Sequence, residues 1–171
     1  TQPPTSPCIS CRNALQLPPM GIDGLTPLRW FALGPYRGGL RQLLLQVRQP
    51  RKRKALSALV QMLSDNLTLP STAVLVPIPS WKQQRTNPLP QLIALGLGRP
   101  TANLLQRPRA GLSQHHLNKR QRQNNLIGAF RASPLDQACP PASIWLVDDI
   151  LTTGATALAA RQALQDAGHR V

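Results

Sequence analysis

The chain has 171 residues, of which 42% are hydrophobic, and it carries 20 Lys and Arg residues against 6 acidic ones, a net charge of +14. This length suits one main domain with a small appendage, and the absence of a run of about 18 apolar residues excludes a membrane-spanning helix. Three cysteines with a single Cys-x-x-Cys pair do not form a disulfide framework, so a reducing cytoplasm is the expected location. The charge indicates an anionic partner, either nucleic acid, a phosphate-rich ligand or an anionic membrane surface.

Residues 1–27 are rich in proline and predict a loop-like segment and a linker. Cys8 and Cys11 in this segment supply half of the four ligands that a structural zinc site requires. Three explanations stay open: another Cys pair precedes Thr1, the site has decayed, or the other ligands come from elsewhere. A Cys-x-x-Cys pair without metal explains the pattern as well as bound Zn²⁺ does. The start without Met and the end at residues 168–171, which resembles a helix end running into a strand, lead us to expect missing residues at one or both ends.

Residues 28–33 predict a strand, and Gly38 and Gly39 precede a predicted helix that extends to Val47 and is broken at Pro50. A second helix is predicted from residue 55 to 65, because apolar residues recur on one of its faces: Leu56, Leu59, Val60 and Leu63. Four consecutive basic residues open this helix: Arg51, Lys52, Arg53 and Lys54. They form either a solvated helix end or a contact surface for nucleic-acid phosphates, which would bind independently of sequence and with strong salt dependence.

The rest of the chain alternates between predicted strands and helices. Strands are expected at 73–78, 103–107, 126–131 and 142–147, and helices at 88–97 and 155–167. Such alternation predicts an α/β fold with a parallel sheet. Residues 108–125 are polar and basic, which predicts a solvated loop.

The most informative segment is 144–156, in which four apolar residues lead into two acids and then into a turn rich in threonine. Four successive apolar residues predict a strand covered on both faces, which ends at Val147. Asp148 and Asp149 then lie at the carboxyl end of that strand, where open α/β sheets bind ligands. Backbone N–H groups at the start of the following helix, with threonine hydroxyls, suit a phosphate. An acidic pair that merely caps a helix in an exposed turn is the alternative interpretation.

Segment 144–156 resembles the phosphoribosyl pyrophosphate (PRPP) motif of type I phosphoribosyltransferases. Other segments resemble the ComF family of competence-associated proteins, which includes GntX-like members. They are a helix start at 36–44, a strand ending in Pro-x-Pro at 74–79, a basic stretch at 81–87, and Gly-Leu-Ser followed by Arg-x-x-Asn-x-x-Gly-Ala-Phe within 111–130. The resemblance covers residues 8–171. It implies a type I phosphoribosyltransferase-like parallel sheet flanked by helices over 28–171, preceded by a small zinc-ribbon remnant over 1–27.

The resemblance also implies roles for individual residues. Asp148 and Asp149 are the expected catalytic residues and hold the ribose hydroxyls of PRPP. The 5′-phosphate is expected on the loop residues Thr152, Thr153, Gly154, Ala155 and Thr156. The pyrophosphate, which PRPP carries with Mg²⁺, is expected to face Ser80 and Lys82. A loop that closes over the ligand is expected to contribute Lys119, Arg120, Arg122 and Asn125.

Two departures from the family pattern stand out. The family usually opens with two Cys-x-x-Cys pairs, whereas this chain has one, and the Arg-Gly-Phe-Asn-Gln stretch on the pyrophosphate side is degenerate over residues 85–91. Membership implies a PRPP-binding protein that handles single-stranded DNA in the cytoplasm during natural transformation, with competence-machinery proteins as partners. The alternative is an active transferase that moves ribose 5-phosphate from PRPP to an unidentified base or amine, and whether turnover occurs stays open.

Overall fold

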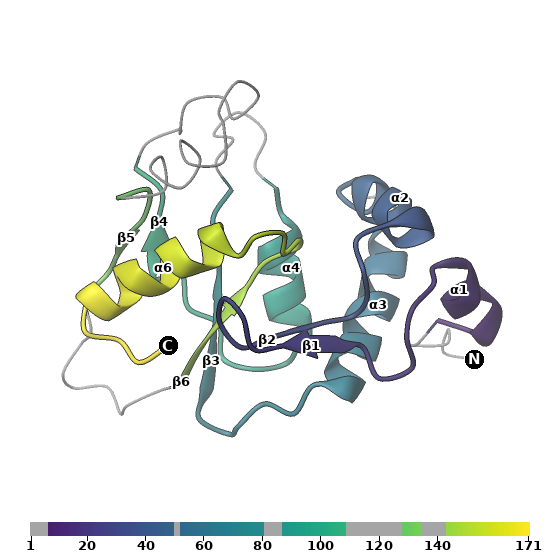
Figure 1. Cartoon of the computed structure of the whole chain (residues 1–171), viewed down its shortest axis with the longest axis horizontal. Coiled ribbons are helices and arrows are strands. Elements are labelled where there is room, and N and C mark those ends of the chain that lie inside the picture. Colours follow the sequence, from purple (N-terminus) through teal and green to yellow (C-terminus); the bar gives the residue numbers. More distant parts are fainter. Residues whose placement is uncertain (1–6, 50–51, 81–86, 109–127, 135–142) are drawn as a thin grey trace. The chain divides into compact units, whose positions relative to one another are not determined.

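The computed structural model describes residues 7–49, 52–80, 87–108, 128–134 and 143–171 (Figure 1). The chain divides into two compact units, Thr1–Leu69 and Pro70–Val171. The sequence places a domain boundary after residue 27, whereas the first compact unit continues through two further helices to residue 69. The cysteine pair and the basic segment therefore belong to one unit, and the acidic motif belongs to the other.

The first unit is mainly helical. Helix α1 (Ile9–Ala14) precedes a short antiparallel hairpin of β1 (Ile22–Gly24) and β2 (Trp30–Ala32), and helices α2 (Gly38–Gln46) and α3 (Arg53–Asn66) follow. Both longer helices have an apolar face, and their buried side chains share one small core. Its buried members are Leu17, Leu40, Leu59 and Met62.

The predicted strand at 28–33 and both predicted helices of this unit are confirmed, with small changes of boundary. Helix α3 buries Met62, which lies three residues after Leu59 on the same face, whereas the predicted Leu63 is half-buried. The loop predicted for residues 1–27 is wrong in part, since it contains α1 and β1. Both elements are too short, at six and three residues, to show a periodic pattern.

A parallel pair of strands forms the centre of the second unit. Strand β3 (Ala73–Pro77) lies beside β6 (Ser143–Val147), with Ala73 opposite Ser143 and Pro77 opposite Val147. Helix α4 (Leu89–Gly96) follows β3, and the chain then returns to Thr101, which bridges Leu75 in parallel on the side away from β6.

The chain leaves β6 in the opposite direction. Helix α6 (Ala155–Asp166) follows β6, and the chain then returns so that the Ile144 N–H donates to the Arg170 carbonyl at 3.1 Å. The neighbouring Ser143 N–H instead points toward β3, where it donates to the Thr72 carbonyl at 3.2 Å. Connections that depart from adjacent strands in opposite directions define a topological switch point, here between β3 and β6.

A second strand pair completes this unit. Strand β4 (Leu105–Gln106) pairs antiparallel with β5 (Arg131–Ala132), and α6 packs against β4, β5 and β6. Figure 1 shows α6 crossing the near side of the strands. Leu75, Val76, Leu89 and Leu164 are among the most deeply buried side chains of this core.

The fold is therefore mixed α/β with a small parallel sheet and helices. The strands predicted at 73–78, 103–107 and 142–147 and both predicted helices are confirmed, whereas β5 begins at Arg131, the residue at which the predicted strand 126–131 ends. No helix within the described ranges is long and apolar enough to cross a membrane.

Candidate functional site

The carboxyl ends of β3 and β6 meet at one edge of the sheet. Beyond the paired residues, the Ile78 N–H donates to the Val147 carbonyl at 2.9 Å, which keeps the strand ends together. Asp148 and Asp149 follow immediately on β6. The acidic pair therefore lies where the two connections diverge, which is the position at which open α/β sheets leave a crevice for ligands.

Asp149 is held by a side chain from the neighbouring connection. Asn87 Nδ2 donates to Asp149 Oδ2 at 2.8 Å, and Asn87 Oδ1 accepts the Leu89 N–H at 3.2 Å at the start of α4. The second bond fixes which end of the amide faces Asp149, since the oxygen is already occupied by a backbone donor. One asparagine thus ties the acidic pair to the first turn of α4 and restricts the orientation of the carboxylate.

Asp148 has a different environment. Its Oδ1 accepts the Asp149 N–H at 2.8 Å. Although the residue is exposed, the protein around its carboxyl group disfavours the charged form, and this together with the nearby charge of Asp149 raises its pKa to about 7. The positive charge of Arg107 acts in the opposite direction. A ligand that brings positive charge or hydroxyl donors would stabilise the charged carboxylate.

The turn after the acids leads into the N-terminus of α6. Gly154 adopts a left-handed conformation with φ of 74°, which a residue with a Cβ reaches only at a cost, and the helix begins at the next residue. Thr153 Oγ1 accepts the Ala155 N–H at 3.4 Å, and Thr152 and Thr153 are exposed. The first-turn N–H groups of a helix lack intrahelical acceptors and carry partial positive charge, so this turn can accept an anion.

The structure brings together most, but not all, of the residues that the sequence predicts for this site. Asp148, Asp149 and the turn 152–156 form one continuous segment, and the half-buried Ser80 lies three residues beyond the end of β3 at the same edge. The remaining predicted residues lie outside the described residues: Lys82, Lys119, Arg120, Arg122 and Asn125.

Two side chains near this site were not predicted as site residues. Asn87 appears in the sequence only as the end of a basic stretch, and Arg107 only as the last residue of the predicted strand 103–107, before the polar and basic residues 108–125. Arg107 follows β4 directly, and its guanidinium lies 4.9 Å from the centre of the Phe130 ring, which precedes β5. The sequence could have indicated Arg107 by its position at the end of a predicted strand, because strand ends position side chains more firmly than loops do.

The basic segment of the first unit lies at the start of α3. Lys52 precedes the helix, Arg53 and Lys54 occupy its first turn, and all three are exposed, while Arg51 lies outside the described residues. Cations at a helix N-terminus oppose the helix dipole, and no acidic residue in that turn compensates. These charges therefore do not stabilise the helix.

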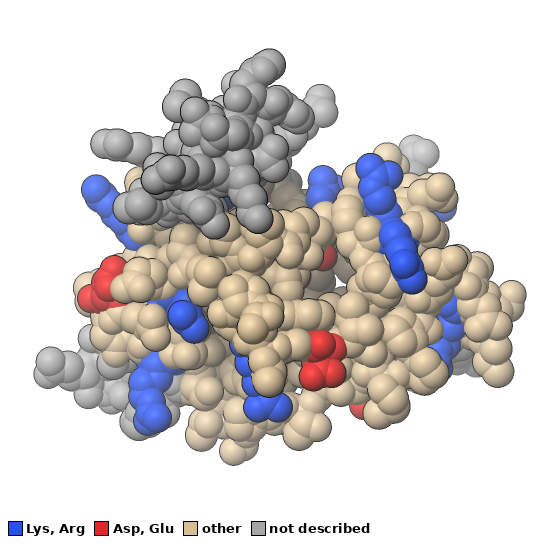
Figure 2. Space-filling model, in the orientation of Figure 1, with Lys and Arg blue, Asp and Glu red and all other residues tan. Residues whose placement is uncertain are grey.

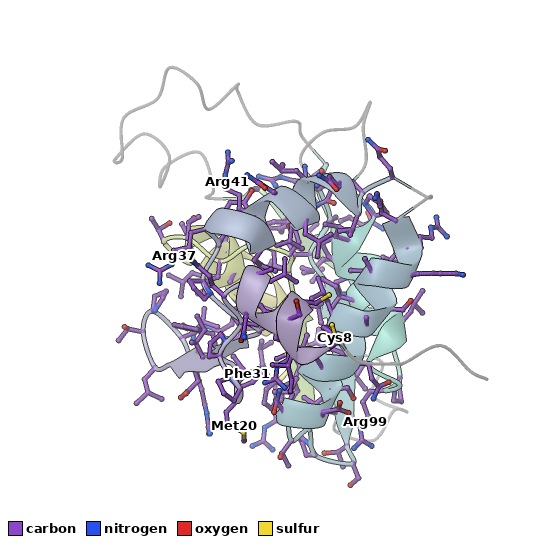
Figure 3. All side chains as sticks on the ribbon, turned by 90° about the vertical axis from the view of Figure 1, so that its right-hand side faces the viewer. Cys8, Met20, Phe31, Arg37, Arg41 and Arg99 are labelled. Carbon is purple, nitrogen blue, oxygen red and sulfur yellow. The ribbon has the colours of Figure 1, made fainter. Side chains whose placement is uncertain are left out.

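Further positive charge lies on α2 of the same unit. Arg37 precedes the helix, and the Arg41 guanidinium lies 5.9 Å from the centre of the Tyr36 ring. Both arginines are exposed, as Figure 3 shows. Over the face of the molecule in Figure 2, Lys and Arg side chains are spread among few acidic ones.

Cys8 and Cys11 are free, exposed thiols at the start of α1, and Figure 3 labels Cys8. Hydrogen bonds from the backbone and side chain of Cys11 lower the pKa of Cys8, and the same contact raises the pKa of Cys11. No group of three or more His, Cys, Asp or Glu side chains in the described part of the chain could hold a metal ion. The zinc site therefore stays a prediction based on two thiols.

Comparison with known proteins adds the following. The chain is 31% identical over 169 residues to the DNA utilization protein YhgH of Salmonella typhimurium (strain LT2), an alignment that covers 90% of this chain and 70% of the relative. The protein of the same name from Salmonella typhi matches with the same identity and coverage. No family model and no solved structure matches the chain.

Proposed function

We propose the following function for this chain, which belongs to the family of the DNA utilization protein YhgH. It binds PRPP or a related ribose phosphate at the edge formed by β3 and β6, and it handles single-stranded DNA in the cytoplasm during DNA uptake. The ligand site uses a type I phosphoribosyltransferase-like arrangement of the second unit. The DNA contacts use the basic segment of the first unit.

The observation that carries the ribose phosphate proposal is the juxtaposition of two oriented carboxylates with a helix N-terminus in one short segment. Asp148 and Asp149 offer acceptors for vicinal ribose hydroxyls, and the 152–156 turn offers donors for a phosphate. A phosphate alone would be repelled by the acids, and a neutral sugar would have no use for the helix N-terminus. A phosphorylated sugar matches both.

Mg²⁺ fits this site by its donor set. It prefers carboxylate oxygens and is usually held by one or two carboxylates together with substrate phosphates, and Asp148 and Asp149 supply that number. When bound, the ion neutralises charge on the pyrophosphate of PRPP. The two carboxylates orient the ribose, and the turn before α6 fixes the 5′-phosphate. Zn²⁺ at Cys8 and Cys11 would need two further ligands.

The DNA proposal rests on the family name and on charge. The relatives are named DNA utilization proteins, and the chain carries a net charge of +14. Lys52, Arg53 and Lys54 are exposed, and the first turn of α3 contains no acidic residue that would compensate their charge. Exposed cations of this kind bind phosphates without reading sequence. Proteins of the competence machinery are the expected partners in this role.

Transfer of ribose 5-phosphate from PRPP to a base or amine is the second candidate. It is favoured by the presence of both carboxylates, each with its own hydrogen bond, because recognition of a phosphate alone does not require them. Their negative charge would stabilise the positive charge that develops at the ribose when pyrophosphate leaves. Release of pyrophosphate in the presence of bases and amines distinguishes this function from binding alone.

Calorimetric titration of PRPP with Mg²⁺ tests the ribose phosphate site. The chain is expected to bind, and the double variant Asp148→Asn/Asp149→Asn is expected to lose roughly 100-fold in affinity, because hydrogen bonds to charged groups each contribute about 1.5–3 kcal/mol. A matched control is Asp65→Asn/Asp166→Asn, which removes two carboxylates that accept hydrogen bonds from Gln61 and Gln162 on their own helices. Absence of binding by the intact chain, or equal binding by the site variant, would reject the proposal.

A further inference from the structure

Two aromatic residues of the first unit differ in what their rings contact. The Trp30 indole N–H on β2 donates to the Thr26 carbonyl at 3.0 Å, and the ring packs so closely on Gly24 that a Cβ there would lie 2.7 Å from it. The ring of Tyr36, which precedes α2, instead faces a charged side chain, since the Arg41 guanidinium lies 5.9 Å from its centre. The hairpin therefore accounts for Trp30 but not for Tyr36.

The backbone that carries Tyr36 is held in place on both sides. The Arg37 N–H donates to the Pro35 carbonyl at 2.8 Å, which places Tyr36 at the centre of a three-residue turn. In the first turn of α2, a Cβ on Gly39 would lie 2.6 Å from the Ala14 carbonyl oxygen, so this turn rests directly on the chain at the end of α1. The position of Tyr36 is therefore fixed before any ligand arrives.

Positive charge surrounds the Tyr36–Arg41 pair. Arg37 and Arg41 lie one helical turn apart, because the Arg41 N–H donates to the Arg37 carbonyl at 3.2 Å, and both side chains are exposed (Figure 3). The first turn of α2 contains no acidic residue. Residues 1–69 contain nine Lys and Arg residues but two acidic ones, Asp23 and Asp65. This charge complements a polyanion and disfavours a basic partner.

An aromatic ring that carries a guanidinium suits an unpaired nucleotide base. Unstacked bases stack on aromatic rings and on guanidinium planes, whereas the bases of a duplex are already stacked on their neighbours. Arg41 is exposed and lies over the half-buried Tyr36 ring, so the side of its guanidinium that faces away from the ring can meet a base. Arg37, one turn earlier, offers its charge to a neighbouring phosphate.

We infer that the Tyr36–Arg41 pair stacks on an unpaired base of single-stranded DNA, with Arg37 on an adjacent phosphate. This inference rests on the proposed DNA function and deepens it, because the basic segment at α3 contacts phosphates alone, whereas the pair adds a contact that a duplex does not offer. The pair lies at the start of α2 and the basic segment follows its end, and a helix of nine residues is only roughly 13 Å long. One strand can therefore contact both.

The experiment compares two single strands of equal length and charge, one of thymidine nucleotides and one without bases, by fluorescence anisotropy. The variants are Tyr36→Leu, which removes the ring but keeps an apolar side chain, and Arg41→Lys, which keeps the charge but removes the planar group. The matched controls are Phe31→Leu, another half-buried aromatic residue of this unit, and Arg29→Gln, an exposed arginine before β2. Thermal unfolding reports whether each variant is folded, and Arg41→Lys, at an exposed position, carries the test if Tyr36→Leu unfolds.

The intact chain is expected to bind the thymidine strand more tightly than the strand without bases. Tyr36→Leu should lose about 5- to 100-fold in affinity for the thymidine strand, the usual effect of removing one stacked aromatic side chain, and less than about twofold for the strand without bases. Arg41→Lys should lose part of the same preference without a change in salt dependence. Both controls should keep the preference of the intact chain.

Equal affinity of the intact chain for the two strands would overturn the inference and leave DNA binding by charge alone. The same conclusion follows if the folded variants of Tyr36 and Arg41 retain the full preference for the thymidine strand. Loss of the preference in Phe31→Leu as well would assign Tyr36 a structural role and also overturn the inference. Failure of the intact chain to bind either strand would instead reject the DNA function together with this inference.

Discussion

The two candidate binding regions lie at two helix N-termini that are built in opposite ways. At α6 the first turn contains no basic residue and is preceded by Gly154 and threonines, and the nearby acids are held by named partners. At α3 the first turn is cationic, and Lys52, Arg53 and Lys54 are all exposed. The first leaves the backbone N–H groups to an incoming phosphate, and the second adds exposed positive charge against the helix dipole.

This difference corresponds to two kinds of ligand. A small phosphorylated sugar needs side chains that are already oriented, because the ordering of each group on binding reduces affinity. A nucleic-acid backbone repeats its charge along its length and can be bound by exposed side chains with many equivalent arrangements. Changes at one region should therefore affect one ligand and leave the other almost unaffected.

The largest effect that separates the regions is expected for the basic segment. Replacement of Arg51, Lys52, Arg53 and Lys54 by Gln should weaken binding of a single-stranded oligonucleotide and reduce the slope of log affinity against log salt by up to about 3, since each phosphate contact on single strands contributes about 0.7. PRPP binding should be unchanged. Fluorescence anisotropy over a salt series measures the slope, and an unaltered slope would remove the segment from the DNA surface.

An intermediate effect is expected at Asn87, which acts through Asp149. Asn87→Ala should weaken PRPP binding about tenfold, because the loss of one hydrogen bond to a carboxylate costs about 1.5 kcal/mol and frees its rotamer. DNA binding should not change. Asn66→Ala is the matched control, since Asn66 donates to the Met62 carbonyl within α3. If the control weakens PRPP binding as much as Asn87→Ala does, Asn87 has no specific role.

The smallest effect concerns stability and pH. Asp148 has an ordinary pKa of 3.8, and in the fold its pKa is raised to about 7, chiefly because the protein around its carboxyl group disfavours the charged form and then because of the charge of Asp149. A raised carboxyl pKa means that the folded state binds a proton more tightly than the unfolded state. The contribution of this group to stability is therefore fully present below about pH 4 and is lost as the pH rises to about 7.

Asp148→Asn should remove this pH dependence. Compared with the unchanged chain, the variant should therefore gain more stability at pH 8 than at pH 4. Urea unfolding at the two pH values measures the change, with Asp166→Asn as an exposed control. The same pH dependence in Asp148→Asn as in the unchanged chain would show that Asp148 is not the group responsible. Together with a loss of PRPP binding, the expected result would mean that the acidic pair reduces stability in exchange for ligand binding.

The extent to which the sequence predicted the structure follows from the length of each pattern. The run from Ile144 to Val147 and the apolar face of α3 span enough residues to predict a strand and a helix, and both are present. The strand is less buried than predicted, since Trp145 and Leu146 are half-buried. Helix α1 and strand β1 are too short for any periodicity, and they were not predicted. The acids and the threonine turn could be predicted because they are contiguous in sequence.

Contacts between distant residues could not be predicted in the same way. Asn87 lies 62 residues from Asp149, and their hydrogen bond depends on the parallel register of β3 and β6, which no local pattern encodes. The stacking of Arg107 on Phe130 likewise depends on the pairing of β4 with β5. The residues that orient a site are thus found from the fold, whereas those that form its continuous segments are found from the sequence.

The most direct test of the account is a map of amide chemical shifts in the presence of each ligand. We predict that PRPP with Mg²⁺ shifts the amides of residues 148–156 and leaves those of Lys52, Arg53 and Lys54 unchanged. A single-stranded oligonucleotide should shift the amides of the basic segment and leave 148–156 unchanged. If PRPP leaves the amides of 148–156 unperturbed, the acidic edge of the sheet is not a ribose phosphate site, and the account is contradicted at its centre.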